Sequence, residues 1–278
     1  MFVLLRTVEP NGGFLSVKKQ KKLLKNNAPI SVSTEKGLPF FMLDVFNGKN
    51  SPDYPSIAEK CGKYSSRIVA PREIIFPDKA GLKRFVPGAS NGIFIFNTAL
   101  ETVKKSGIEP SKISVTVIDR NAVMCEKISL LLPFASPVRV VTSRPERYTE
   151  ICHKIYEEYG ASVIVRTTYE PSTKKDVVIC CEGVSNASMN DAAVFSFKRG
   201  SYGKIRFYGS QILLTESHSE IVPKNIRSTD FVAAITELCA STTYKSAVYS
   251  DTETKCNTYC GASPEECLRC YIYGAFKT

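Results

Sequence analysis

The chain has 278 residues, of which 43% are hydrophobic and 23% are charged. These proportions are those of soluble globular proteins and exclude a disordered chain, a collagen and a coiled coil. The formal net charge is +10, and most of the excess lies in residues 1–110, where 17 Lys and Arg stand against 9 Asp and Glu. No apolar run approaches the ~20 residues of a membrane-spanning helix, and Arg6 interrupts the apolar start too early for a signal peptide. We therefore expect a cytoplasmic protein without a membrane partner.

The densest basic stretch is Lys18-Lys19-Gln20-Lys21-Lys22. Its positive field favours a small anionic ligand, although a solvated lysine face that aids solubility explains the same residues. No aromatic residues are interleaved with these lysines, so a nucleic-acid partner is not expected.

The first hundred residues predict a small α/β region. Apolar runs at residues 40–46 and 67–70 indicate strands, and residues 57–64 between them indicate a helix. The spacing of apolar residues from 95 to 103 predicts a further helix that ends near Gly107. We expect a basic N-terminal region over residues 1–107 and a second domain over residues 108–278.

The middle of the chain alternates between predicted strands and helices. Asn121 can cap a first helix that Pro133 stops, and an amphipathic helix from Tyr148 to Tyr159 ends at Gly160. Apolar, β-branched runs predict four strands, at residues 113–118, 138–142, 161–165 and 176–181. This alternation is typical of a doubly wound parallel α/β sheet.

The sheet is expected to continue towards the C-terminus. Residues 193–197 and 204–214 have the pattern of strands, and residues 231–240 that of an amphipathic helix. We expect this helix to pack against the same sheet.

Two short segments carry a resemblance to a known family. Thr142-Ser143-Arg144 follows the second strand of the middle region, and Glu182-Gly183-Val184-Ser185 follows the fourth. With the N-terminal region and linking helix, this layout resembles the shikimate dehydrogenase and glutamyl-tRNA reductase group over residues 92–183. The resemblance implies a Rossmann-like domain that binds NADP. Ser143 and Arg144 would receive the 2′-phosphate, Glu182 and Gly183 would lie near the nicotinamide-side ribose, and Asn121 would lie at the phosphate-binding turn.

The turn after the first strand departs from the family's pattern. It reads Asp119-Arg120-Asn121-Ala122-Val123-Met124, without the glycines that let a backbone approach a pyrophosphate. Two functions therefore stay open. The first is an NAD(P)-dependent oxidoreductase of the shikimate dehydrogenase type, intact or degenerate, acting on a small anionic metabolite. The second is a non-catalytic Rossmann-like binding or regulatory protein that binds no dinucleotide. The segment Thr142-Ser143-Arg144 also has a purely structural interpretation, in which Ser143 caps the next helix.

The two histidines give weak signals. His153 lies one step off the apolar stripe of its helix and is expected at the surface. His218 lies in a polar segment beside two glutamates, where it is either a solvated loop residue or an acid–base group.

Ten cysteines are expected to be reduced in a cytoplasmic protein. Four of them crowd near the C-terminus in the spacing C-x3-C-x6-C-x2-C: Cys256, Cys260, Cys267 and Cys270. Four thiolates can hold a zinc ion or an iron–sulfur cluster, but structural thiols or a disulfide fit the spacing as well. We expect no metal, and a helix that begins with a capping box at Ser263 and Glu266.

Overall fold

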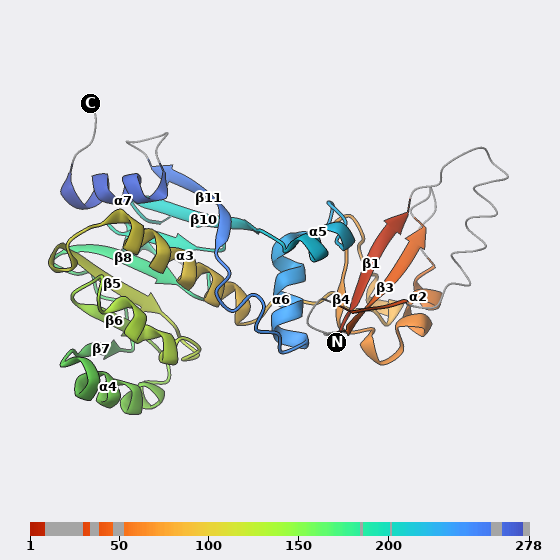
Figure 1. Cartoon of the computed structure of the whole chain (residues 1–278), viewed down its shortest axis with the longest axis horizontal. Coiled ribbons are helices and arrows are strands. Elements are labelled where there is room, and N and C mark those ends of the chain that lie inside the picture. The colour runs from red at the N-terminus through yellow and green to blue at the C-terminus, as the bar shows by residue number, and fades with distance from the viewer. Residues whose placement is uncertain are drawn as a thin grey trace. The chain divides into compact units, whose positions relative to one another are not determined.

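The structure is a computed structural model that describes residues 1–8, 30–33, 39–46, 53–183, 186–200, 202–256 and 263–274. The chain divides into two units (Figure 1). Met1–Gly88 and Leu213–Lys245 form the first, and Ala89–Ile212 and Ser246–Thr278 form the second. This division differs from the expected boundary after residue 107. Helix α3, Ser90–Ser106, belongs to the second unit because it packs against that unit's sheet.

The first unit contains a four-stranded sheet in the order β2-β3-β1-β4. Its strands are β1 Val3–Val8, β2 Ile30–Ser33, β3 Pro39–Phe46 and β4 Ile68–Val69. Strand β1 is parallel to both of its neighbours, whereas β2 is antiparallel to β3. The predicted helix between the strands is α2, Tyr54–Cys61, followed by a 3-10 turn at Gly62–Tyr64.

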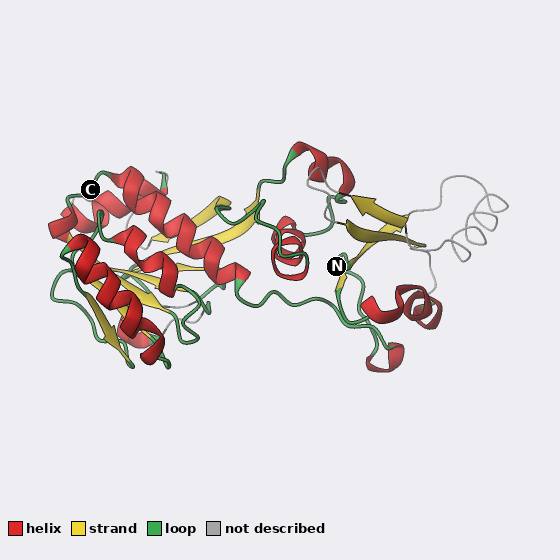
Figure 2. Cartoon of the chain, turned by 60° about the horizontal axis from the view of Figure 1, so that its bottom comes forward, coloured by secondary structure: helices red, strands yellow, loops and turns green. Residues whose placement is uncertain are grey.

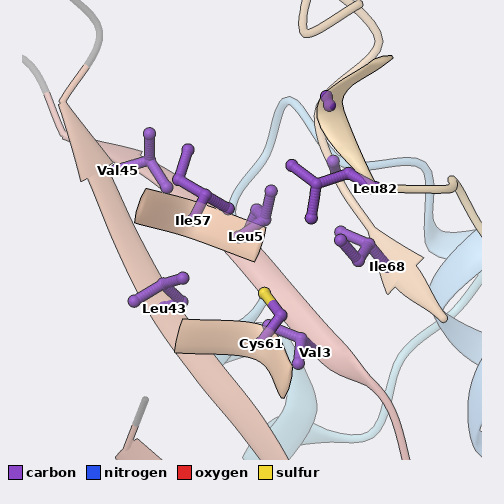
Figure 3. Close-up of a cluster of buried hydrophobic side chains, with 10 residues drawn as sticks. Val3, Leu5, Leu43, Val45, Ile57, Cys61, Ile68 and Leu82 are labelled. Atoms are coloured by element: carbon purple, nitrogen blue, oxygen red, sulfur yellow. The ribbon is translucent and has the colours of Figure 1, made fainter. Parts of the chain in front are cut away.

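Apolar residues cover both faces of this sheet. Alternate side chains of β1 and β3 form one buried cluster with residues of α2 (Figure 3): Val3, Leu5, Leu43, Val45, Ile57 and Cys61. On the other side, the ring of Phe231 meets Phe2 and Phe40 edge-on, with centroids 5.9 and 5.4 Å away. Because side chains alternate between the faces of a strand, each strand contributes to both layers.

Phe231 lies on α6, Ser228–Leu238, which completes the first unit together with α5, Glu216–Ile221. The expectation that this helix packs against the sheet of the middle region is therefore wrong. Its apolar face is buried as predicted, with Val232 and Ile235 at most 1% exposed. A hydrophobic face shows that a helix is buried, but it does not specify the element against which the helix packs.

The second unit contains a seven-stranded sheet in the order β11-β10-β9-β8-β5-β6-β7. Every neighbouring pair is parallel except β10 and β11. The strands are β5 Ile113–Ile118, β6 Val138–Val141, β7 Val163–Arg166, β8 Lys175–Cys180, β9 Ala193–Ser196, β10 Ile205–Ile212 and β11 Tyr249–Cys256. The mixed α/β class and the predicted strands of the middle region are confirmed, with bounds that differ by one or two residues.

Helices lie alongside these strands (Figure 2). Helix α3 packs on β8 and β9, and α7, Pro264–Tyr273, packs on α3 and β10. Helix α3 also comes close to the residue that follows β8, since a Cβ added to Gly92 would stand 2.6 Å from the carbonyl oxygen of Cys181. Helix α4, Glu146–Tyr159, contacts β7 and ends at Gly160 as predicted.

Between β5 and β6 the expected α-helix is instead a 3-10 helix, η4, Cys125–Leu131. A further 3-10 turn at Ala187–Met189 places Met189 in a buried cluster with Val178, Cys180 and Val194. Among the described residues, no helix has the length and apolar character needed to cross a membrane.

Candidate functional site at the carboxyl ends of the strands

Three segments meet where the parallel strands β5, β6 and β8 end. The amide of Ser143 donates to the carbonyl of Arg120 at 3.1 Å, and the amide of Cys181 donates to the carbonyl of Ile118 at 3.1 Å. The amide of Arg120 donates to Oε1 of Glu182 at 2.6 Å. The structure therefore brings together the segments that contain all five predicted site residues: Asn121, Ser143, Arg144, Glu182 and Gly183. In open parallel sheets, this edge is where ligands bind.

Asp119 organises the loop that follows β5. Its carboxylate accepts the amides of Val123 at 2.9 Å and Met124 at 2.7 Å, and its side chain is buried. The expectation that Asn121 caps the following helix is wrong, because the N-cap residue of η4 is Met124, no side chain caps it, and Asn121 is exposed. Ala122 has φ of 56°, a left-handed conformation that folds the chain back so that the two amides face Asp119.

Tyr148 of α4 gives Asp119 a third donor. Its hydroxyl donates to Oδ2 of Asp119 at 2.5 Å. Burial, and then the hydrogen bond to Asp119, raise the pKa of Tyr148 far above its ordinary value, so the phenol remains a donor. From the sequence, Tyr148 is expected only as part of the apolar stripe of its helix. The contact had no sequence signal beyond a tyrosine among buried residues, where a hydroxyl needs a partner.

Glu182 holds the beginning of the same loop. Oε1 accepts the Arg120 amide, whereas Oε2 is buried and has no hydrogen-bond partner among the described residues. Burial raises the pKa of Glu182. Hydrogen bonding from the backbone amides of Arg120, Asn121 and Glu182 itself opposes this rise, and the nearby charge of Asp119 adds to it. The carboxylate thus faces the loop backbone on one side and a desolvated environment on the other.

Gly183 is required by its surroundings. Its φ is 73°, and an added Cβ would stand 2.9 Å from side-chain atoms of Phe197 and Lys198. Both observations favour glycine for reasons of packing, whatever the site binds.

Ser143 and Arg144 are exposed at the start of α4. The N-cap residue of α4 is Pro145, and no side chain caps the helix, so the structural interpretation of Ser143 as a cap is wrong. Thr142 orders this segment instead. Its hydroxyl donates to the Arg120 carbonyl at 3.2 Å and accepts the Arg144 amide at 3.1 Å. A hydroxyl and a guanidinium are left facing solvent, which suits an anion.

The two histidines lie outside this site. His153 is exposed on α4, as expected. His218 is not in a solvated loop. It lies in α5, is 3% exposed, and its Nδ1 is 2.7 Å from the hydroxyl of Tyr244. Its ring also meets Phe231 edge-on at 5.2 Å, so His218 is part of a packed core.

The C-terminal cysteines are only partly described. Cys267 is buried and Cys270 half-buried on α7, whose predicted capping box is confirmed. Cys260 and the side chain of Cys256 lie outside the described residues, as does the basic stretch of residues 18–22. Within the described part of the chain, no three His, Cys, Asp or Glu side chains form a group that could hold a metal.

Comparison of the chain with protein-family models, with curated proteins and with solved structures finds no match. The function is therefore inferred from the geometry of the residues above.

Proposed function

We propose that the chain is a Rossmann-like binding protein that binds a small anion and no dinucleotide. The strand order supports the Rossmann-like part of this proposal. Counted from β5, the six parallel strands run β7-β6-β5-β8-β9-β10, which corresponds to the order 3-2-1-4-5-6 of dinucleotide-binding domains. In such domains the turn after the first strand and the following helix N-terminus bind the pyrophosphate through backbone amides.

The observation that carries the proposal is that amides of this loop already donate hydrogen bonds to carboxylates of the chain itself. Asp119 accepts the amides of Val123 and Met124, and Glu182 accepts that of Arg120. Two carboxylates of the chain thus stand where a dinucleotide would place its phosphates, and they would repel that anion. The segment that follows is the 3-10 helix η4 instead of an α-helix with a free N-terminus. The residues of this turn therefore do not fit NADP.

The anion is assigned to Ser143 and Arg144. Both residues are exposed, and neither caps α4. Arg144 can bind a phosphate or carboxylate through two parallel hydrogen bonds, and the Ser143 hydroxyl can add a third donor.

The same two residues favour a second candidate, an NADP-dependent oxidoreductase acting on a small anionic metabolite. An exposed hydroxyl and guanidinium after the second strand suit the 2′-phosphate of NADP. Binding would require Asp119 and Glu182 to leave the loop amides.

Thermal unfolding separates the two functions. We expect inorganic phosphate to stabilise the protein and to have no such effect on Arg144→Ala, while NADPH and NADH leave the unfolding temperature unchanged. A ligand present at about 100 times its Kd adds about 2.7 kcal/mol, which is readily measured. Lys154→Ala, on the exposed face of the same helix, is the control and should respond to phosphate as the unmodified protein does.

Stabilisation by NADPH that is lost in Arg144→Ala would support the oxidoreductase and overturn the proposal. Stabilisation by NADH and NADPH alike would contradict both the proposal and the role of Arg144.

A further inference from the structure

Two carboxylates hold the loop of residues 119–124, which is here called the β5 loop. They differ in the hydrogen bonds that they accept. Asp119 holds its far end through two amides and takes a third hydrogen bond from Tyr148. Glu182 holds the beginning of the loop through the Arg120 amide, and its second oxygen has no partner in the described part of the chain. Glu182 is therefore the less stabilised of the two carboxylates.

The groups around Glu182 make its negative charge unfavourable. Asp119 faces it from the end of β5, and the thiols of Cys180, the last residue of β8, and of Cys181, which follows it, lie beside it. The side chain of Lys198 approaches the neighbouring Gly183, but its ammonium lies over the Phe197 ring at 5.7 Å. No described cationic side chain forms an ion pair with Glu182. Burial and the charge of Asp119 raise the pKa of this carboxyl, so it takes up a proton at a higher pH than an ordinary glutamate.

We infer that Glu182 is a proton-operated latch on the β5 loop. Ionised, it binds the Arg120 amide and repels anions; protonated, it releases this amide to a small inorganic anion such as phosphate. A neutral carboxylic acid is a weaker acceptor than a carboxylate, and it no longer repels an approaching anion. Asp119 keeps its three donors and holds the rest of the loop in place. This inference concerns how anion binding at this edge of the sheet is regulated. It rests on the proposed function only in assuming that the edge binds a small anion.

The amide resonance of Arg120 reports the state of the latch directly. We expect it to titrate with a midpoint above 4.5, the ordinary pKa of glutamate, and to move upfield as the pH falls and the hydrogen bond weakens. In Glu182→Gln, which carries a neutral side chain of the same shape, the Arg120 resonance should no longer titrate. Added phosphate should shift this resonance in the unmodified protein about one pH unit below the observed midpoint but not about two units above it, and in Glu182→Gln at both pH values.

Glu150→Gln is the matched control. It removes an exposed carboxylate from α4 of the same unit, and the Arg120 titration should persist in it. An Arg120 resonance that is flat with pH in the unmodified protein would overturn the inference, even if Glu182→Gln did not fold. An unchanged titration in Glu182→Gln, or a phosphate shift independent of pH, would overturn it as well. NADPH binding at neutral pH would contradict the proposed function but not the latch, so the two can fail separately.

Discussion

Arg139 and Asp176 form a buried ion pair within the seven-stranded sheet. Nη2 of Arg139 lies 2.7 Å from Oδ2 of Asp176, and both side chains are less than a tenth exposed. Thr116 and Tyr169 donate further hydrogen bonds to the carboxylate, at 3.1 and 2.9 Å. Burial raises the pKa of Asp176, and the charge of Arg139 opposes this rise. The pair joins β6 and β8 near their amino ends, and Thr116 connects it to β5, so its role is in folding and not at the proposed site.

Replacing Asp176 with Asn should therefore destabilise the protein strongly. The guanidinium of Arg139 would stay buried without its counter-charge, which costs about 3–5 kcal/mol in comparable cases. Urea denaturation measures the change in the free energy of unfolding. Glu150→Gln breaks an exposed pair on α4 and is the control, with little expected change. If Asp176→Asn lost no more stability than this control, the ion pair would have no part in holding the strands together.

At the same scale, the sequence predicted which segments meet at the candidate site but misjudged the roles of single residues in it. Ser143, Arg144 and Glu182 follow buried strands, and in a parallel sheet such positions gather at one edge. The sequence predicts a cap at Asn121, whereas the loop amides bind Asp119. The left-handed conformation of Ala122, which brings two amides to Asp119, has no sequence signal comparable to a glycine. Long-range partners such as Tyr148 and Asp119 become apparent only once the helix is placed.

At the scale of elements, strands and helix caps were predictable where residues adjacent in the sequence determine them. Strand β5 is an unbroken run of six buried residues, a pattern that two-sided burial in a parallel sheet demands. Helix α6 was predicted as a helix but given the wrong partner, because an apolar face does not specify the sheet against which it packs. The segment before β6 has helical spacing, yet it forms the 3-10 helix η4 directly after the Asp119 turn.

The capping box of α7 gives a prediction at this scale. The hydroxyl of Ser263 accepts the Glu266 amide at 3.3 Å, and Oε2 of Glu266 accepts the Ser263 amide at 3.3 Å. Ser263→Ala should lower the free energy of unfolding by about 1 kcal/mol, because an amide of the first turn loses its acceptor. Ser263→Thr keeps a capping hydroxyl and should lose much less when both are compared by urea denaturation. Equal losses in the two variants would show that the hydrogen bond does not set the stability of α7.

At the scale of the whole molecule, the order of elements along the chain conceals the division into units. The first unit takes α5 and α6 from residues 213–245, far from its strands in sequence. The second takes β11 and α7 from beyond that insertion. Periodicity and turn residues describe neighbours along the chain, and so they favoured one boundary at residue 107 where the chain in fact changes units more than once.

The role of α3 provides the test of this division. Its Phe94, Ile95, Phe96 and Val103 are at most 2% exposed. Each buried side chain of this size contributes about 1.5–3 kcal/mol, and a whole domain is stable by only about 5–15 kcal/mol. A protein that begins at residue 108, where the sequence suggested a boundary, should therefore fail to fold.

A protein that joins residues 89–212 to residues 246–278 should fold, because it holds every element of the second unit. Ile212 pairs with Tyr249 across β10 and β11, so the two ends to be joined are close, and a linker of about five Gly and Ser residues spans them. The matched control uses the same linker but begins at residue 108 and differs only in lacking α3. We expect a single cooperative urea transition and dispersed amide resonances for the first protein and neither for the control. A cooperative transition in the control would show that α3 is a linker between the units and not a part of the second unit. If neither protein folded, the second unit would depend on the first.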